Sequence, residues 1–275
     1  MTNLSRIVTA VISLSLSVAM PVAGQIPSAE LPAGPLILSG GGRVPLQSIL
    51  TPFLDAAGGT DSARIAYIWI PRTLPEATNT KTTFEALLTE HFGVPVTLLH
   101  SNDRDDWDSD QFVQVLQEAT GVWISGGSQG HLANMMLDTR SHGELQALLQ
   151  RGGAYGGVSG GAMLATSFML RGLDGKPVLV ARGHTRGFGF LQDVIINPHL
   201  TAQQRESQLV TAIHYRPELL GVGIDDNTAI VVEGHTFTVV GDGRVAVYDN
   251  ERHGSRWFYY LDPGTAFDLT TRTVH

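Results

Sequence analysis

A serine within a glycine-rich segment is the first residue whose surroundings could support chemistry. The run Gly157-Val158-Ser159-Gly160-Gly161 matches G-x-S-x-G, a pattern in which a serine is presented on a sharp turn between a strand and a helix. Only small neighbours let the backbone bend that tightly. The free N–H groups and the positive dipole end of the following helix can stabilise an oxyanion beside the hydroxyl. The pattern indicates a nucleophilic Ser159, and a plain glycine turn is the alternative.

A second glycine turn, Gly126-Gly127-Ser128-Gln129, follows the apolar run Val122-Trp123-Ile124. The carboxyl ends of neighbouring parallel strands open into one crevice, so this turn can face Ser159. The backbone N–H of Gly127 would then complete an oxyanion hole together with that of Gly160. The alternative is a tight strand-to-helix turn in which glycine only supplies a positive φ.

A serine nucleophile needs a general base, and His199 is the strongest candidate among the ten histidines. It follows the apolar run Val194-Ile195-Ile196 and is therefore expected at a strand end, as the two glycine turns are. The charge of histidine changes near neutral pH, so its ring can take and return a proton. A histidine at a strand end is also a common structural hydrogen-bonding group, so its position alone does not decide its role.

The acid that would orient the histidine has three candidates. Asp225 and Asp226 follow the apolar run Val222-Gly223-Ile224, again at the expected end of a strand, whereas Asp174 lies closer to Ser159 in the sequence. Aspartates at such positions often serve as caps of helices and turns. The spacing of the residues therefore leaves the choice of acid open.

Alternating strand-like and helix-like segments position these residues. Such alternation predicts βαβ units, and hence an α/β fold with a mostly parallel sheet and helices on both faces. Further short strands, separated by the turn signals Glu233-Gly234 and Gly241-Asp242-Gly243, predict C-terminal antiparallel hairpins attached to the main sheet. The expected strands cover residues 36–38, 64–70, 94–99, 122–124, 228–232, 236–240 and 244–248, and the expected helices cover residues 46–57, 82–92, 111–119, 132–137 and 145–150.

The composition narrows the classes of function. The chain has 275 residues, no cysteine, 18 Lys plus Arg and 26 Asp plus Glu, which gives a formal net charge of −8 at pH 7. The absence of cysteine excludes disulfides, zinc–thiolate sites and thiol catalysis. The basic residues are scattered, and this argues against a nucleic-acid partner because phosphate contacts need a basic patch. The hydrophobic share of 43% predicts a sizeable core.

The first residues have the pattern of a secretory signal. Arg6 supplies a positive charge, and residues 7–20 form an uncharged apolar run that is shorter than the ~20 residues needed to cross a membrane. We expect residues 1–24 to be a cleaved signal peptide, residues 25–275 to form a single domain, and the protein to be secreted or periplasmic with no membrane anchor. A buried amino-terminal helix is the alternative, but Pro21 would interrupt it.

Four motifs occur along the chain in this order: the turn at residues 126–129, the Ser159 elbow, the run at residues 194–199 and the run at residues 223–232. Together they resemble the cyanophycinase and α-aspartyl dipeptidase family of serine peptidases, over about residues 36–249. The resemblance implies the flavodoxin-like α/β fold of class I glutamine amidotransferases. It also implies an enzyme that hydrolyses small peptide or β-aspartyl-type amide bonds through an acyl-enzyme, with no metal or organic cofactor.

The resemblance also assigns roles to single residues. It implies that Ser159 is the nucleophile and that His199 is its general base. Asp226 falls where the cyanophycinases carry a triad glutamate, which is one methylene longer, whereas in the dipeptidase branch Asp174 would take this role. With these roles, His199 would take the proton of the hydroxyl and later protonate the leaving amine.

Positions linked to specificity in the cyanophycinases differ in this chain. Gln129 matches a glutamine that lies near the substrate in those enzymes, whereas Asn197 replaces an acidic residue. Of the arginines that those enzymes carry after the histidine, only Arg205 is present here, and Gln203 and Gln208 replace two others. A site built for a charged partner loses affinity when that partner becomes neutral, so a small peptide or isopeptide is expected as the substrate instead of cyanophycin. The predicted substrate-binding residues are Gln129, Asn197, Arg205 and Gln208.

Two other functions stay open. A catalytically silent binding protein could have the same fold, because a fold alone does not supply chemistry. An amidase or esterase could use the same residues on substrates that are not peptides. The sequence also leaves the oligomeric state open, with a homodimer among the candidates.

Overall fold

The structure is a computed structural model that describes residues 33–42, 47–75 and 80–275. These described residues belong to one compact unit, Leu31–His275. The expected signal peptide at residues 1–24 lies outside the described residues, so it stays a prediction. No helix in the described part of the chain is both long enough and apolar enough to cross a bilayer.

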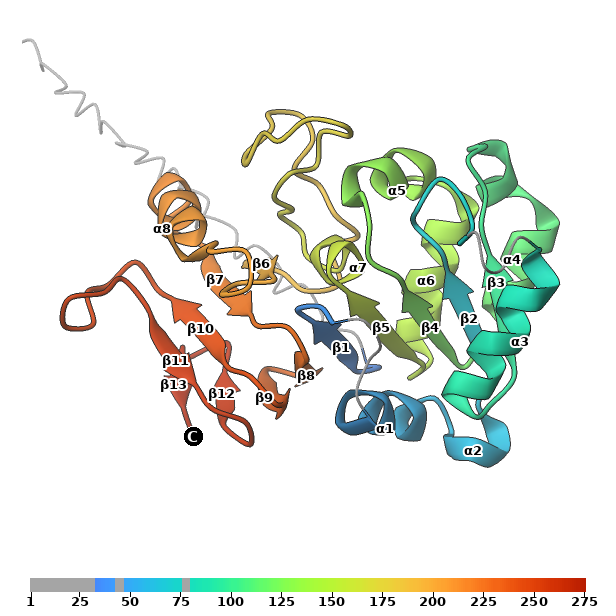
Figure 1. Ribbon diagram of the computed structural model, residues 1–275, viewed down its shortest axis with the longest axis horizontal. Coiled ribbons are helices and arrows are strands. Elements are labelled where there is room, and N and C mark those ends of the chain that lie inside the picture. Colours follow the sequence, from blue (N-terminus) through green and yellow to red (C-terminus); the bar gives the residue numbers. More distant parts are fainter. Residues whose placement is uncertain (1–32, 43–46, 76–79) are drawn as a thin grey trace, which may run out of the picture. The chain divides into compact units, whose positions relative to one another are not determined.

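A mixed sheet, nine-stranded in the described part of the chain, forms the centre of this unit (Figure 1). Its parallel strands are β1 (Leu36–Ser39), β5 (Ala154–Val158), β4 (Gly121–Ile124), β2 (Ile65–Ile68) and β3 (Val96–Leu99), and its antiparallel strands are β8 (Thr228–Glu233), β9 (Thr236–Gly241), β12 (Ala266–Asp268) and β13 (Thr273–Val274). The strand order is β13-β12-β9-β8-β1-β5-β4-β2-β3. The predicted α/β class with a mostly parallel core and antiparallel C-terminal strands is therefore confirmed.

Helices cover both faces of the main sheet. Successive side chains of each strand point to opposite sides, so apolar side chains on both sides need a covering layer. Ile37 and Tyr67 pack with α1 (Gln47–Ala56) and α3 (Lys81–Phe92) on one face. Leu38 and Ile68 pack with α4 (Asp110–Glu118), α6 (Arg140–Gln150) and α7 (Gly160–Leu164) on the other. Strands buried on both faces need continuous apolar runs, as β1, β2 and β4 have. The described helices are α1 (Gln47–Ala56), α2 (Gly59–Ser62), α3 (Lys81–Phe92), α4 (Asp110–Glu118), α5 (Gln129–Met136), α6 (Arg140–Gln150), α7 (Gly160–Leu164) and α8 (Glu206–Tyr215), with a 3-10 helix over Asp105–Asp108.

The ends of helix α3 are fixed by residues with clear capping roles. The hydroxyl of Thr80 accepts a hydrogen bond from the N–H of Thr83 at 3.2 Å, and Gly93 ends the helix with a left-handed φ of 69°. Its buried side chains, spaced for one face of a helix, are Phe84, Leu88 and Phe92. This face packs on the aromatic end of β2, where the ring centroids of Tyr67 and Phe84 are 6.1 Å apart.

A separate sheet supplies the candidate histidine and its acid. Its described strands are β6 (Val194–Pro198), β7 (Leu220–Ile224), β10 (Val245–Tyr248) and β11 (Tyr259–Leu261), in the order β11-β10-β7-β6. The prediction that the strand at residues 244–248 joins a hairpin on the main sheet is wrong, because β10 pairs with β7. The strand before His199 also lies in this second sheet, parallel to β7.

The turn after β9 explains why the chain changes sheets. Gly241 has a φ of 105°, and a Cβ on it would lie 2.2 Å from the backbone oxygen of Asn227. The N–H of Asp242 donates to that same oxygen at 2.9 Å, and the N–H of Gly243 donates to the hydroxyl of Thr228 at 2.8 Å. The chain therefore folds back over the start of β8, where only glycine fits, and leaves the main sheet before β10 begins.

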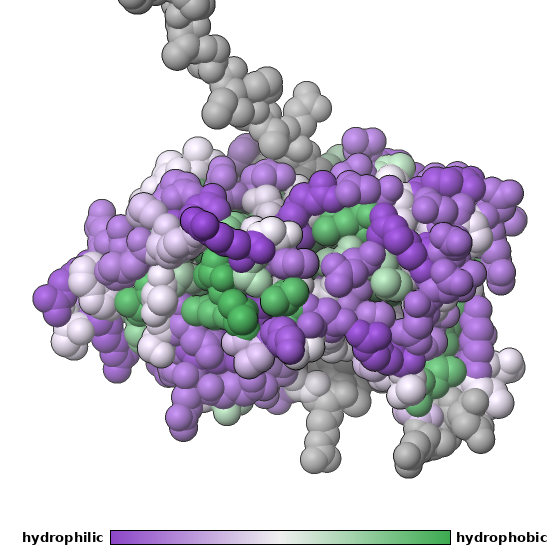
Figure 2. Space-filling model, turned by 90° about the horizontal axis from the view of Figure 1, so that it is seen from above, coloured by the Kyte–Doolittle hydropathy of each residue, from purple (hydrophilic) through white to green (hydrophobic). Residues whose placement is uncertain are grey.

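The carboxyl ends of β1, β4 and β5 point toward the top of Figure 1. Figure 2 shows the face seen from there as mostly hydrophilic, with several separate apolar patches. In an α/β sheet, ligands bind at this end of the strands. The glycine turns that follow these three strands, at residues 40–42, 126–127 and 160–161, all lie at this edge.

Candidate active site

Ser159 lies on the sharp turn between β5 and α7, with a φ of 54° and a ψ of −111°. Few residues other than glycine adopt a positive φ, so the turn holds the serine in a strained conformation. A Cβ on Gly157 would lie 2.6 Å from the carbonyl carbon of Gly161, and one on Gly161 would lie 2.4 Å from the oxygen of Ile124. The N–H of Ser159 donates to the oxygen of Ser39 at 2.9 Å and ties the turn to β1.

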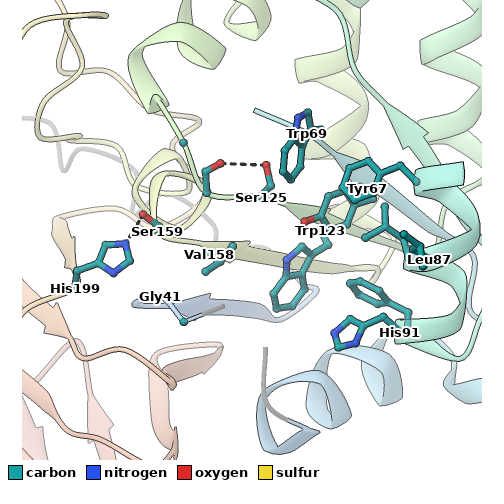
Figure 3. A pocket seen from close by; sticks show the side chains of 16 residues that line it. Gly41, Tyr67, Trp69, Leu87, His91, Trp123, Ser125, Val158, Ser159 and His199 are labelled. Atoms are coloured by element: carbon teal, nitrogen blue, oxygen red, sulfur yellow. Dashed lines mark hydrogen bonds between the residues drawn. The ribbon is translucent and has the colours of Figure 1, made fainter. Parts of the chain in front are cut away.

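His199 lies between Ser159 and Asp226. Its Nε2 is 2.8 Å from Oγ of Ser159, and its Nδ1 is 2.6 Å from Oδ1 of Asp226; Figure 3 shows the ring turned toward the serine. His199 follows β6 and Asp226 follows β7, and these neighbouring strands pair Pro198 with Ile224. The two side chains are 21% and 38% exposed. The distances are those of a Ser–His–Asp hydrogen-bond chain, assembled from two sheets.

The glycines after β1 hold the histidine and the aspartate in place. The oxygens of Gly40 and Gly41 accept hydrogen bonds from the N–H groups of His199 and Asn227, both at 3.0 Å. Gly41 has a φ of 152°, and a Cβ on it would lie 2.3 Å from Nδ1 of His199. Sequence reasoning did not give these glycines a role. The sequence feature that could have revealed this role is the glycine cluster at residues 40–42, which follows an expected strand as the two other glycine turns do.

The turn at Gly126 and Gly127 lies beside the serine. A Cβ on Gly126 would be 3.3 Å from the Cβ of Ser159, and a Cβ on Gly160 would be 2.4 Å from the oxygen of Gly127. Gly127 itself has a φ of 142°. The structure thus brings the two predicted oxyanion-hole residues together next to Ser159. Gly160 must be glycine because of the nearby oxygen of Gly127, and glycine at 127 is favoured by its positive φ and by Ile70, which would lie 3.0 Å from an added Cβ.

The other candidate acids serve other partners. Asp225 accepts hydrogen bonds from the N–H and the hydroxyl of Thr201, at 3.1 and 2.7 Å, and so fixes the loop that follows His199. Asp174 accepts a hydrogen bond from Ser128 at 2.7 Å. Asp226 is the aspartate whose carboxylate contacts the ring of His199. Among the described residues, no group of three or more His, Asp and Glu side chains is arranged to hold a metal ion.

Asp174 belongs to a polar cluster that includes Ser128 of the 126–129 turn. Its carboxylate pairs with Arg72, and its Oδ2 is 3.8 Å from Nδ1 of His131. Burial, together with the nearby Arg72, lowers the pKa of His131 despite the carboxylate. The serine that caps α5, Ser128, joins this cluster through its hydroxyl. The cluster therefore anchors the start of α5.

The predicted substrate-binding residues gather around Arg171. Its two terminal nitrogens donate to Oδ1 of the fully buried Asn197 at 2.7 Å and to Oε1 of Gln208 at 2.9 Å. Gln129 donates to the backbone oxygen of Arg171 at 3.1 Å, and Arg205 donates to the oxygen of Pro198 at 2.9 Å. These contacts fix the loop that carries Arg171, and a role of the four residues in substrate binding stays a prediction.

Arg171 is an arginine that sequence reasoning missed. It sits in a loop with a φ of 52°, and no motif surrounds it. Burial, and next the positive charge of Arg205, lower its pKa to about 10. Its side-chain hydrogen bonds to Asn197 and Gln208 go to neutral amide oxygens, which leave its positive charge uncompensated at those contacts.

A cavity of about 510 Å³ opens beside Ser159 and His199. It is named here the aromatic cavity, because most of its larger lining side chains are aromatic or aliphatic. Figure 3 shows it between the serine and helix α3. Its larger wall side chains come from β2 and the residue that follows it, from β4 and from α3, and include Tyr67, Trp69, Phe84, Leu87, Leu88 and Trp123. The apolar spacing of the expected helix at residues 82–92 did not predict a cavity.

Comparison with known proteins decides the family. The family described as Peptidase family S51 matches residues 36–240 of the chain. The chain belongs to peptidase family S51. The resemblance drawn from the four motifs is thereby confirmed, and the S51 chain is a serine-type peptidase or hydrolase.

Several proteins are similar to this S51 peptidase over most of its length. A cyanophycinase of Synechococcus elongatus is 30% identical over 251 residues, covering 87% of this chain and 76% of the relative. A cyanophycinase of Geminocystis herdmanii is 27% identical over 209 residues, covering 74% of this chain and 76% of the relative. Solved structures share the fold: a peptidase from an acI-B1 Actinobacterium has a TM-score of 0.66 at 21% identity, covering 87% of this chain and 98% of that one. A putative peptidase E from Listeria monocytogenes has a TM-score of 0.55 at 14% identity, covering 76% of this chain and 99% of that one.

Proposed function

We propose that this S51 peptidase hydrolyses amide bonds of small peptides or isopeptides through an acyl-enzyme formed on Ser159. The observation that carries the proposal is the hydrogen-bond chain in which His199 lies between Oγ of Ser159 and the carboxylate of Asp226. Membership of a family of serine-type peptidases supports the same conclusion.

The first step is attack by Oγ of Ser159 on the carbonyl carbon of the substrate while the hydroxyl proton passes to Nε2 of His199. The carboxylate of Asp226 accepts a hydrogen bond from Nδ1–H of the ring. This bond selects the tautomer in which Nε2 is free to accept the proton, and it stabilises the imidazolium that forms.

The tetrahedral intermediate carries a negative oxygen, which needs hydrogen-bond donors placed in advance. The N–H groups of Gly127 and Gly160 are the candidates, because their backbones meet beside Ser159. His199 then gives its proton to the nitrogen of the leaving amine, and the C–N bond breaks. A water molecule that passes a proton to His199 attacks the acyl-enzyme, releases the acid and restores Ser159.

The relatives and the differences at specificity positions support the proposed substrate class. The relatives named cyanophycinase support an exopeptidase or isopeptidase that acts on β-aspartyl-type amide bonds. Cyanophycin itself is disfavoured, because the neutral Asn197 replaces an acidic residue of those enzymes and is fully buried against Arg171. A substrate without the arginine side chain fits these residues better.

Covalent labelling tests whether Ser159 is reactive. A fluorophosphonate loses fluoride when an activated serine attacks its phosphorus, so the intact mass should rise by one phosphonyl group in the wild type and stay unchanged in Ser159→Ala. A panel of α-dipeptides, β-aspartyl dipeptides and simple esters then identifies the reaction. Turnover of amides supports the proposal, and turnover of esters alone would point to an esterase. A folded wild-type protein that is never labelled would be a silent binding protein and would overturn the proposal.

We also propose that the enzyme acts outside the cytoplasm, as a secreted or periplasmic protein. The charge at Arg6 and the uncharged apolar run at residues 7–20 support this location. Cell fractionation followed by amino-terminal sequencing is the test. A mature chain that begins near residue 25 in the exported fraction is expected, and an uncleaved chain confined to the cytoplasm would contradict the proposal.

A further inference from the structure

The aromatic cavity extends from the reacting groups to helix α3. Figure 3 shows Ser159 and His199 on one side of it and Leu87 on the other, with Val158 and Trp123 between them. Its volume of about 510 Å³ lies within the ~300–1,000 Å³ usual for small-molecule sites. A substrate whose carbonyl carbon is held at Ser159 would therefore place a neighbouring group of the substrate in this cavity.

The walls of the cavity are held in position by contacts among themselves. The ring of Trp69 meets that of Phe84 edge-on with centroids 4.9 Å apart, and Nε1 of Trp69 donates to the oxygen of Thr73 at 2.8 Å. Trp123 meets Phe92 edge-on at 5.9 Å. Edge-on aromatic pairs favour one arrangement of the rings, so the cavity is formed before a ligand arrives.

The described lining carries almost no charge. None of its residues within the described ranges is Asp, Glu, Lys or Arg, and the hydroxyl and imidazole groups among them belong to Tyr67, His91, Ser125, Ser159 and His199. A guanidinium or carboxylate in the cavity would give up its hydration without an opposite charge among these residues to pair with. An apolar side chain would instead gain from leaving water.

We propose that the aromatic cavity receives an apolar side chain of the substrate, aromatic or branched aliphatic, next to the bond that Ser159 attacks. The inference rests on the proposed function and narrows it from small amides in general to those with such a side chain beside the scissile bond. It also gives a physical reason why an arginine-bearing substrate is disfavoured, independent of the replacements near Arg171.

Labelling rates measure this preference without a known substrate. Two fluorophosphonates of equal length are compared, one with a benzyl or isobutyl tail and one with a tail that ends in a guanidinium. The second-order rate constant for modification of Ser159 is expected to be at least about ten-fold higher for the apolar tail, which is the discrimination that apolar pockets commonly reach. Equal rates, or a faster reaction of the cationic probe, would overturn the inference while leaving the proposed function intact. Failure of both probes to label Ser159 would overturn the proposed function and the inference with it.

A variant at the edge of the cavity shows whether the tail binds there. Leu87 lines the cavity but is 49% exposed, so Leu87→Asp does not bury a charge in the core. The new carboxylate attracts the cationic tail and does not attract the apolar one. The ratio of the apolar to the cationic labelling rate should therefore fall by about five-fold or more. Loss of folding would instead lower both rates together.

The matched control is Ala86→Asp. Ala86 precedes Leu87 on the same helix, is exposed, and does not line the cavity. Ala86→Asp introduces the same charge at a helix-propensity cost at least as large as that of Leu87→Asp, and the ratio of the two labelling rates should stay within about two-fold of the wild type. If the ratio of the two rates stays within about two-fold of the wild type in Leu87→Asp as well, the tail does not occupy the aromatic cavity and the inference is wrong.

Discussion

Gly41 lies against the imidazole of His199, so closely that a Cβ on Gly41 would be 2.2 Å from Cε1 of the ring and 2.4 Å from Oδ1 of Asp226. The turn after the first strand thus supports both groups that the second sheet brings to the serine. The hydrogen bonds from the N–H groups of His199 and Asn227 to the oxygens of Gly40 and Gly41 join the two sheets at this point. A glycine far from Ser159 in the sequence therefore sets the position of the candidate base.

Gly41→Ala should displace the imidazole and lower kcat/KM by about 100-fold, because a misplacement of about 1 Å is enough for a loss of that size. Hydrolysis or fluorophosphonate labelling provides the rate. Gly234→Ala is the control, since Gly234 also has a positive φ of 56° but nothing lies within 4 Å of the added Cβ. The control should lose some thermal stability and keep its labelling rate. Equal losses of rate in both variants would contradict the positioning role of Gly41.

Asp226→Asn should lower the rate of hydrolysis by about 10³- to 10⁴-fold, because the amide cannot stabilise the imidazolium and can select the wrong tautomer of His199. The matched change Asp174→Asn removes a carboxylate that pairs with Arg72 and Ser128 instead. We expect it to alter kcat by less than about five-fold. Steady-state kinetics on the same substrate compares the two. A larger loss in Asp174→Asn than in Asp226→Asn would show that the acid is assigned to the wrong residue.

Stability should decline in mild acid because of His142. Burial lowers the pKa of His142, whose ring packs beside Phe188 with centroids 5.1 Å apart. The unfolded chain then binds this proton more readily than the folded chain, so the free energy of unfolding falls as pH drops below the ordinary histidine value of about 6.5. In His142→Gln, Tm should fall less between about pH 7.5 and about pH 5.5 than it does in the wild type. Parallel curves of Tm against pH for the two proteins would contradict this assignment.

Arg171→Met should destabilise the fold by about 1–3 kcal/mol, because it leaves the buried amide oxygen of Asn197 without its charged donor. Unfolding in urea measures the difference. Arg182→Met, at an exposed arginine of the same segment, is the control and should change stability by less than about 0.5 kcal/mol. If Arg171→Met were as stable as the wild type, Arg171 would not organise this part of the site.

The parts that the sequence predicted well depend on local patterns. The alternation of apolar runs and amphipathic segments predicted the parallel core, because a continuous apolar run fits a strand that is buried on both faces. The same pattern put Ser159, His199 and Asp226 after strands. Their convergence was expected from a family resemblance and from the rule that strand ends meet at one edge.

The parts that it missed depend on contacts between distant segments. The pairing of β10 with β7 depends on the glycine turn at Gly241, whose close approach to Asn227 no local pattern reveals. The role of Gly41 exists only because the second sheet lies next to β1. The aromatic cavity is lined by side chains of α3, β2 and β4 that are far apart in the sequence, and apolar spacing on a helix does not distinguish a residue of a filled core from one that lines a cavity.

The rate at which a fluorophosphonate modifies Ser159, followed from about pH 5 to about pH 8 in the wild type and in His199→Ala, tests the central claim most directly. The wild-type rate should fall as pH drops through the range in which histidines gain a proton, because a protonated ring cannot take the proton of the serine. In His199→Ala, with folding verified by its Tm, the rate should be about 10³- to 10⁴-fold lower and should not vary with pH over this range. A folded His199→Ala protein that reacts as fast as the wild type, or a wild-type rate that is independent of pH, would contradict the account.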